Sequence, residues 1–312
     1  MVCLPVSAKE EKIETNTSPA VYKTLGDLFK HTEDYPEVKK LTADDYVIPG
    51  MKTTLSRSYF TKKPKACHNA TPQGVTVMED KVLISAYCHD HVHMSVLYVL
   101  DKDSGKLEKT LCLDGMPHVG SIAYDSSRDV VWVATHHDGQ AAAQSVSASE
   151  INEAENGELL PWKDTVILEG LPRTSYLTMD GSDLVAGTFE KAGHVHIRWY
   201  DLDRKKLKSE VDASVKSVQA GDNLQGVAIT DGQILVSASD GPNLASTVSV
   251  YSVKDKKLDK PEKTVELPPR AEQISVDGDV LLTCFEGGAA AYRKEGSVHV
   301  DRLLGLKLSD LL

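Results

Sequence analysis

The sequence of 312 residues lacks several features that would place it in a common functional class. It contains no apolar run of about 18 residues, so no membrane-spanning helix is expected. It carries fewer Lys and Arg residues (35) than Asp and Glu residues (46) and has no basic stripe, so nucleic acid is not expected as a partner. It has neither the C-x-x-C pairs of many zinc sites nor the G-x-S-x-G turn of serine hydrolases.

The N-terminal residues differ in character from the rest of the chain. Residues 2–8, VCLPVSA, are apolar and end in small residues, and a charged stretch begins at Lys9. This pattern is typical of the end of a signal peptide. We therefore expect residues 1–8 to be the remnant of a signal peptide and the protein to be extracellular or attached to the cell surface. The alternative is a frayed N-terminus of a cytosolic protein.

Residues 9–45 are polar and charged, and they are expected to form a leader with one short helix. Val21, Leu25 and Leu28 follow a helical spacing, and Ser18 is placed to cap the helix.

The cysteines allow one disulfide. Cys67 and Cys88 flank the same predicted strand, residues 73–87, and are expected to pair in an exported chain. Cys112 and Cys284 lie in apolar strand patterns, which indicates buried thiols.

Residues 46–312 repeat a pattern of short strands. Each repeat has a small or polar lead-in, an apolar strand, a turn and a second apolar strand: TPQGVTVMEDKVLISAY, PHVGSIAYDSSRDVVWVAT, TSYLTMDGSDLVAGTF, NLQGVAITDGQILVSAS and AEQISVDGDVLLTCF. The repeats start 46 to 56 residues apart, and a third and a fourth strand follow in each. Such units are typical of β-propeller blades. We predict an all-β fold, a β-propeller of five blades, with six or seven blades as alternatives.

The last blade needs a fourth strand, and two segments qualify. Residues 301–308, DRLLGLKL, follow the fifth repeat directly. Residues 46–52, YVIPGMK, resemble the fourth strands of other repeats and would close the ring from the N-terminal side.

The topology of a blade gathers the histidines on one face. The loop between the second and third strands lies on the same side of an up-and-down blade as the segment that leads into the first strand. Of the 11 histidines, eight fall in these segments: His89, His91, His93, His118, His136, His137, His194 and His196.

A ligand-binding funnel is therefore expected on that face, at the top of the central channel. The first strand of each blade is innermost, so the residues that lead into it face the axis. These residues are polar in all five blades, and with two histidines above them they make up the predicted ligand-binding site: Gln73, His118, Arg173, Gln225, Glu272, His89 and His136. Burying Arg173 and Glu272 without partners would be costly, so each is expected to be paired, hydrated or in contact with a ligand.

A metal ion is a further expectation for the same face. Histidines two residues apart on an extended chain point to one side and can chelate zinc. The predicted metal ligands are His89, His91, His194 and Glu190. A calcium ion held by oxygen atoms, a hydrated funnel without metal, and acid–base chemistry by histidines and carboxylates are the alternatives.

The stretch TPQGVTV with the later SVLYVLDKDSGKLEKTL resembles the secreted YncE-like and lactonase-like β-propellers over residues 46–308. Lactonase-like propellers hold a channel cation with Glu, Asn and Asp, which the resemblance carries to Glu272, Asn223 and Asp240. TPQGV, repeated as NLQGV, also resembles a segment of bacterial five-bladed glutaminyl cyclases. The overall pattern is similar to that of uncharacterised exported proteins of Gram-positive bacteria.

The sequence thus favours an extracytoplasmic β-propeller that binds a small-molecule ligand, polar or glycan-like, with calcium or zinc as candidate cofactors. Two other classes stay open. One is an enzyme, either a cation-assisted hydrolase or lyase or a cyclase acting on N-terminal glutamine, which needs a base within reach of a substrate proton. The other is a platform for protein partners, which needs a broad apolar patch on the rim.

Overall fold

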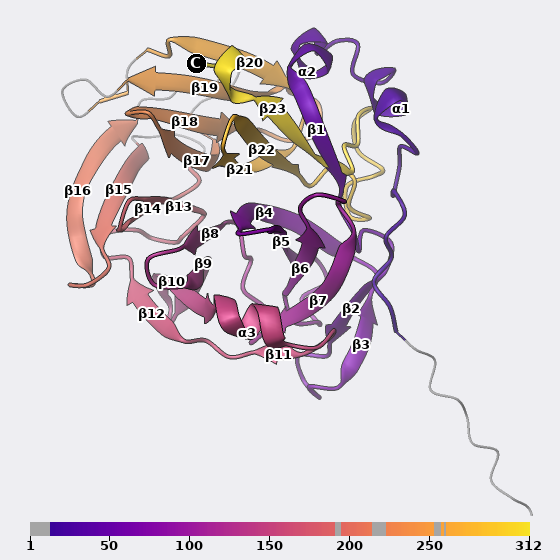
Figure 1. The fold of residues 1–312 in the computed structure, drawn as a ribbon, viewed down its shortest axis with the longest axis vertical. Helices are drawn as coiled ribbons and strands as arrows, with labels where there is room; N and C mark the ends of the chain where they lie inside the picture. The colour runs from indigo at the N-terminus through magenta and orange to yellow at the C-terminus, as the bar shows by residue number, and fades with distance from the viewer. Residues whose placement is uncertain (1–12, 191–194, 214–222, 253–256, 259) are drawn as a thin grey trace, which may run out of the picture.

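The computed structural model describes residues 13–190, 195–213, 223–252, 257–258 and 260–312. Five antiparallel sheets surround one axis, and the first strand of each blade lies beside the first strands of its two neighbours (Figure 1). The prediction of an all-β propeller with five blades is confirmed, and the alternatives of six or seven blades are wrong.

Blades 1 and 2 are meanders that run from the axis to the rim. Blade 1 consists of β4 (Ala70–Met78), β5 (Lys81–Cys88), β6 (Val96–Asp101) and β7 (Leu107–Leu113). Blade 2 consists of β8 (Ile122–Asp125), β9 (Val130–His137), β10 (Gln140–Ser147) and β12 (Asp164–Ile167).

Blade 2 is interrupted before its outer strand. Between β10 and β12 the chain forms α3 (Ala148–Glu153) and β11 (Leu159–Leu160), and β11 pairs in parallel with β7 at the outer edge of blade 1. This excursion explains why the repeats at Gly120 and Tyr176 are the furthest apart, and it joins the two blades at the rim.

Blades 3 and 4 follow the same order of strands. Blade 3 consists of β13 (Tyr176–Asp180), β14 (Asp183–Gly187), β15 (Val195–Asp201) and β16 (Lys206–Ala213). Blade 4 consists of β17 (Leu224–Thr230), β18 (Gln233–Ala238), β19 (Ser246–Ser252) and β20 (Lys263–Leu267).

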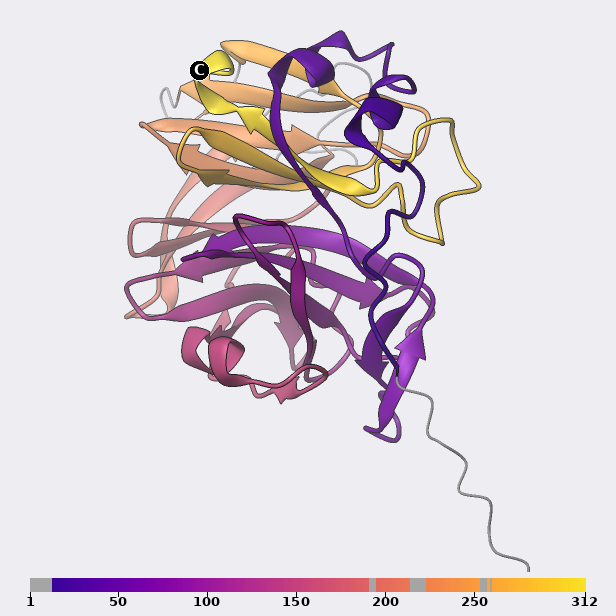
Figure 2. The same ribbon diagram turned by 45° about the vertical axis from the view of Figure 1, so that its right-hand side comes forward.

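Blade 5 is completed by a strand from the N-terminal part of the chain. Its first three strands are β21 (Ala271–Asp277), β22 (Val280–Phe285) and β23 (Arg302–Lys307). Its outer strand is β1 (Thr42–Val47), antiparallel to β23, and Figure 2 shows this indigo strand beside the yellow blade. Closure from the N-terminal side is confirmed, although the strand begins earlier than residue 46. The alternative was wrong, because residues 301–308 contain the third strand rather than the fourth.

The segment before β1 packs on the outside of blades 4 and 5. It forms α1 (Leu25–Phe29) and α2 (Pro36–Leu41) instead of a single helix capped by Ser18; Thr24 caps α1. Leu28 and Val38 are fully buried in the core of these blades. No helix in the described part of the chain has the length and apolar character that a membrane crossing requires.

A short hairpin precedes blade 1. It consists of β2 (Thr54–Arg57) and β3 (Pro64–Cys67), and a 3₁₀ turn, η1 (Leu308–Asp310), follows blade 5.

One side-chain amide joins the first strands of several blades at the centre of the ring. Gln273 of β21 is 1% exposed, and its Oε1 accepts the N–H groups of Val75 (2.8 Å) and Ile122 (2.9 Å). Its Nε2 donates to the carbonyl groups of Ile122 (2.7 Å) and Leu177 (3.4 Å). A single residue of blade 5 therefore bonds to the first strands of blades 1, 2 and 3.

Two glycines make room for this contact. A Cβ added to Gly74 would lie 2.7 Å from Oε1 of Gln273, and one added to Gly226 would lie 2.9 Å from its Cα. The first strands of blades 1 and 4 can approach Gln273 so closely only because these residues have no side chain.

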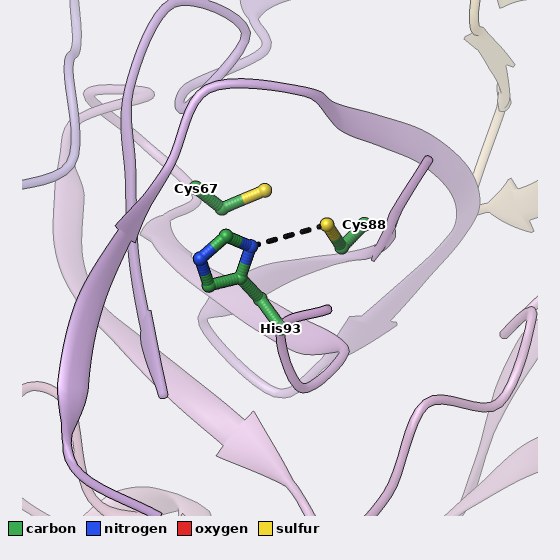
Figure 3. Close-up of side chains that lie close together, drawn as sticks. All are labelled: Cys67, Cys88 and His93. Atoms are coloured by element: carbon green, nitrogen blue, oxygen red, sulfur yellow. Dashed lines mark hydrogen bonds between the residues drawn. The ribbon is translucent and has the colours of Figure 1, made fainter. Parts of the chain in front are cut away.

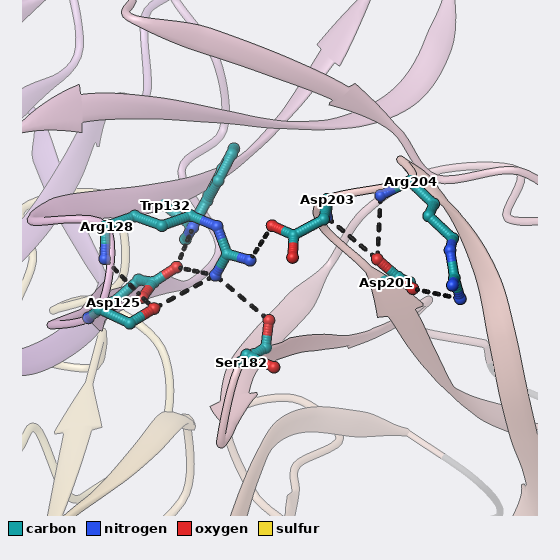
Figure 4. Close-up of polar contacts among 8 residues, drawn as sticks. Asp125, Arg128, Trp132, Ser182, Asp201, Asp203 and Arg204 are labelled. Carbon is teal, nitrogen blue, oxygen red and sulfur yellow. Dashed lines mark hydrogen bonds and ion pairs between the residues drawn. The ribbon is translucent and has the colours of Figure 1, made fainter.

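Blades 2 and 3 are joined further out by a polar network (Figure 4). Asp125 at the end of β8 accepts hydrogen bonds from Arg128 Nη1 (2.9 Å), from the Ser127 hydroxyl (2.6 Å) and from Trp132 Nε1 (3.3 Å). Arg128 in turn bonds Asp203 of blade 3 (2.6 Å). Burial alone would raise the pKa of Asp125, but these hydrogen bonds outweigh it and hold the pKa below its usual value.

Replacement of the central amide should destabilise the whole ring. Gln273→Leu keeps the size of the side chain but leaves buried N–H and carbonyl groups without partners, and each lost hydrogen bond costs about 1 kcal/mol. We expect a loss of about 2–4 kcal/mol in the free energy of unfolding, measured by chemical denaturation. Gln233→Leu is the control, because the Gln233 side chain bonds Glu262 at the surface. A Gln273→Leu protein as stable as the control would contradict the role given to this residue.

Candidate functional site

A cavity of about 610 Å³ opens at the end of the axis where the first strands begin. Six of the residues predicted from the sequence line it: Gln73, His118, His136, Arg173, Gln225 and Glu272. They come from all blades, since each blade contributes the segment that leads into its first strand or the end of its second strand. The structure therefore brings together most of the predicted ligand-binding residues at one place.

Irregular strand pairing points three of these side chains at the axis. Gln73, Gln225 and Glu272 each sit where the register between the first and second strands shifts. These shifts lie at residues 72–75 in blade 1, 224–226 in blade 4 and 271–274 in blade 5. A shift of this kind breaks the strict alternation of a strand and redirects its side chains.

Glu272 is the most unusual group in the wall of the cavity. The residue is only 4% exposed, its side chain reaches the cavity, and none of the described residues donates a hydrogen bond to its carboxyl group. Burial, and then the nearby negative charge of Glu286, raise the pKa of Glu272 well above its usual value; Arg270 opposes them only in part. Glu272 is therefore a buried carboxylic acid that faces a cavity.

Glu286, by contrast, is well satisfied. Its carboxylate accepts hydrogen bonds from Gln73 Nε2 (2.9 Å) and from Arg270 Nη1 (3.0 Å). The same guanidinium group lies over the ring of Tyr292 (3.9 Å to the centroid) and bonds Glu295 (2.5 Å). The positive charge of Arg270 is thus shared by two carboxylates and an aromatic ring, and little of it is left for Glu272.

His118, another residue of the cavity wall, belongs to a group of packed rings. His118 packs on Tyr87 with ring centroids 4.2 Å apart. Desolvation, and then the charges of His91, His89 and Arg173, lower the pKa of His118, so the ring is neutral at neutral pH. A neutral imidazole can both donate and accept a hydrogen bond at the cavity wall.

The remaining predicted ligand-binding residue, His89, lies above the cavity rather than in its wall. It is exposed, its Nδ1 lies 3.2 Å from the Tyr87 hydroxyl, and its ring centroid is 5.5 Å from that of Tyr292, a residue of the wall. Arg173, which does line the cavity, is exposed and donates to the carbonyl group of Phe189 (2.7 Å), so its charge is hydrated.

The predicted metal ligands do not gather in the part of the chain that the structure describes. His91 has a positive φ of 52° and stacks on Tyr87 (5.8 Å between centroids). This turn ends the alternation that was expected to place His89 and His91 on one side. Glu190 is half-buried beside the last strand residues of β14, and His194 lies outside the described residues. Asp240 and Asn223, which the lactonase resemblance suggested, do not line the cavity.

Sequence reasoning did not select Tyr292 and Phe189 as site residues. Tyr292 belongs to the long segment between β22 and β23, which carries no strand pattern in the sequence. Phe189 is an aromatic residue that the strand pattern places either between blades or at the rim, where it could stack on a ligand; it follows β14 and lines the cavity. The repeats do point to Glu286 as a site residue. It lies in the loop between the second and third strands of its blade, the loop that carries histidines in blades 1 and 2.

The predicted Cys67–Cys88 disulfide is not formed. The topology does bring the two residues together, but both thiols are free and buried, and the ring of His93 lies beside them (Figure 3). Cys112 and Cys284 are buried free thiols, as the sequence predicted.

The comparisons with known proteins concern the fold. No family profile and no curated protein matches the chain. A crystal structure of Myxococcus xanthus glutaminyl cyclase is similar with a TM-score of 0.51 and 12% identity, over 85% of this chain and 94% of that one. Two further structures are less similar. Kuenenia stuttgartiensis hydrazine synthase has a TM-score of 0.41 and 11% identity, over 69% of this chain and 55% of that one. A nidogen/laminin complex has a TM-score of 0.41 and 10% identity, over 75% of this chain and 84% of that one.

The described strands, together with the fold shared with the glutaminyl cyclase, define a five-bladed β-propeller with a polar cavity at one end of its axis. The resemblance to propellers is confirmed at the level of the fold. No family match supports membership of the YncE-like or lactonase-like families.

The buried acid should cost stability at neutral pH. A carboxyl group whose pKa is raised on folding has no effect on stability below its unfolded pKa, about 4.3. It destabilises the fold increasingly as the pH rises from there to the folded pKa, by about 1.4 kcal/mol for each pH unit.

We therefore expect Glu272→Gln, which removes the charge but keeps the shape, to unfold at a higher temperature than the wild type at pH 7. At pH 4 the two should coincide, and calorimetric melting curves at both values test this. Glu266→Gln, at an exposed position of β20, should change little at either pH. A Glu272→Gln protein less stable than wild type at pH 7 would show that the carboxylate is satisfied and charged.

Proposed function

We propose that the cavity binds a small polar molecule that donates hydrogen bonds to Glu272. The observation that carries this proposal is the buried carboxyl group without a protein partner. A buried polar group without a partner costs free energy, and a ligand with an amine, amide or hydroxyl group would remove that cost. Gln73, Gln225 and His118 lie in the same wall and offer further donors and acceptors, which gives the convergent polar groups that a ligand pocket needs.

A donor-bearing molecule suits this wall better than a hard cation does. Calcium requires six to eight oxygen ligands, with several carboxylates among them. Glu286 is already bonded to Arg270 and Gln73, so Glu272 is the one carboxyl group of the pair that is left for a ligand. A glycan-like ligand, rich in hydroxyl donors, and a small amine or amide both fit the proposal.

A second candidate function is acid–base catalysis of the glutaminyl-cyclase type. The specific observation that favours it is the raised pKa of Glu272, because a carboxyl group with a raised pKa keeps its proton to a higher pH and can give it to a substrate. The fold shared with a glutaminyl cyclase is an analogy in support of this candidate, since one fold can carry many functions.

In such a reaction the N-terminal amine of a glutaminyl peptide attacks the carbon of its own side-chain amide. The new C–N bond forms, the bond to the amide nitrogen breaks, and ammonia leaves. Glu272 would give a proton to the leaving nitrogen and recover one from the attacking amine, so that the acid is unchanged at the end.

A role as a platform for protein partners has less support. The large apolar side chains exposed on the described residues are few, and only Tyr59, Phe60 (74% exposed) and Val92 lie together, which makes a small patch. A platform would be expected to show a broad apolar patch. The proposal that the protein is exported rests on residues 2–8 alone.

One set of variants tests the proposed function. Wild type, Glu272→Gln and the control Glu266→Gln are titrated calorimetrically with oligosaccharides, small amines and amides, calcium chloride and a peptide with N-terminal glutamine. The peptide is also followed by mass spectrometry for loss of ammonia. We expect a donor-bearing molecule to bind wild type and control alike and Glu272→Gln at least tenfold more weakly.

Turnover of the peptide that falls at least a hundredfold in Glu272→Gln would establish the second candidate. Equal binding of the same ligand by wild type and Glu272→Gln would refute the proposal. Binding of calcium that depends on Glu272 would replace it with the cation alternative.

A further inference from the structure

We propose that Cys67, Cys88 and His93 form a binding site for zinc, separate from the axial cavity. One ligand atom of each residue lies within 4.8 Å of the other two, and all three residues are buried, with exposures of 2%, 4% and 6%. Ligand atoms around one zinc ion, at about 2.0–2.3 Å from it, lie roughly 3.5 Å from each other. Among the residues that the structure describes, this is the group of His, Cys, Asp and Glu side chains with such a geometry.

The three residues come from different segments that the fold brings together. Cys67 ends β3, Cys88 ends β5, and His93 stands at the far end of the loop that follows β5 (Figure 3). The pairing of β4 with β5 places Ala70 opposite Cys88, which fixes the distance between the two cysteines. An isolated bridge between His93 and Ser58 fixes the histidine.

The ring of His93 makes one hydrogen-bond contact among the described residues, and that contact is to a thiol. Its Nδ1 lies 3.2 Å from the sulfur of Cys88, while its Nε2 is buried and has no hydrogen-bond partner among the described residues. An imidazole that is 94% buried would normally satisfy both nitrogens. Among the described residues, the ring faces the thiols through Nδ1, as expected if Nδ1 is a metal ligand.

Backbone N–H groups face both sulfurs. The N–H of Asn69 faces the sulfur of Cys67, and the N–H groups of Val92 and His93 face that of Cys88. Such donors stabilise the negative charge of a sulfur that binds a metal.

The charge and softness of these donors select zinc. Two thiolates neutralise the double positive charge of the ion, so a neutral complex is buried, and thiolate with imidazole is the donor set that zinc prefers. Binding displaces the protons of Cys67 and Cys88, and water completes the fourth position. A hard cation such as calcium prefers oxygen ligands and is not expected here.

A zinc ion at this place would also fix the rim of the cavity. The loop from Cys88 to His93 carries His89 and His91, whose rings pack on Tyr87, and Tyr87 packs on His118 in the cavity wall. The ion would hold both ends of this loop.

Cobalt is the probe for the site, because cobalt bound to thiolate absorbs in the near ultraviolet and visible range. The full-length protein is reduced, freed of metal with a chelator and titrated with cobalt chloride, and zinc is then added as competitor. We expect one equivalent of cobalt, a thiolate-to-cobalt absorption band, and its loss when zinc is added.

The variants test the ligands one by one. Cys88→Ser and His93→Gln should bind cobalt at least tenfold more weakly, and Cys112→Ala should bind it like the wild type, because Cys112 is an equally buried thiol outside the cluster. Circular dichroism confirms that each variant is folded. If a variant does not fold, the wild-type titration decides.

Absence of a thiolate band in the reduced, folded wild type would overturn the proposal. So would cobalt binding that survives in folded Cys88→Ser and His93→Gln. A Cys67–Cys88 disulfide in the purified protein that re-forms in the presence of zinc would show that the pair is a structural disulfide and would also overturn it. None of these outcomes bears on ligand binding by Glu272.

Discussion

The ring depends on the amide of Gln273. The first strands of a five-bladed propeller crowd around a narrow axis. Gln273 supplies two acceptor contacts and two donor contacts to the first strands of blades 1, 2 and 3. One of the N–H groups that it accepts, that of Val75, lies at the shift in the strand pairing of blade 1. Because a buried backbone group without a partner is costly, this one side chain stabilises both the ring and that shift.

The same irregularity gives the cavity its chemistry. Residues 271–274 leave the regular ladder, so that two consecutive side chains, Glu272 and Gln273, are both used at the axis. Gln273 closes the channel, and Glu272 stands in the wall of the cavity above it. The pairing of Arg270 with Glu286 then leaves Glu272 without a partner. In this account Gln273 stabilises the fold and the neighbouring Glu272 destabilises it. Functional sites often lower the stability of the scaffold that carries them.

Much of this arrangement could be predicted from the sequence, because the repeats fix the number of blades and the blade topology fixes which segments meet. Gln73, His118, Arg173, Gln225 and Glu272 were placed together by that reasoning alone. The sequence could not show that Glu272 lacks a partner, since that depends on the rotamer of Arg270 and on Tyr292, which comes from a segment without strand pattern. It also misled where local turns matter: the positive φ of His91 separates His89, His91 and His93, and only His93 turns inward to the cysteines.

The central claim is that Glu272 is an unpartnered carboxyl group with a raised pKa that faces a ligand cavity. The most direct test is the titration of its side-chain carboxyl carbon by NMR in protein labelled with ¹³C-glutamate, with the resonance assigned by its loss in Glu272→Gln. The account predicts that this resonance titrates well above the usual glutamate pKa of about 4.3. A resonance that titrates near 4.3 would contradict the account, because Glu272 would then be an ordinary, well-solvated carboxylate.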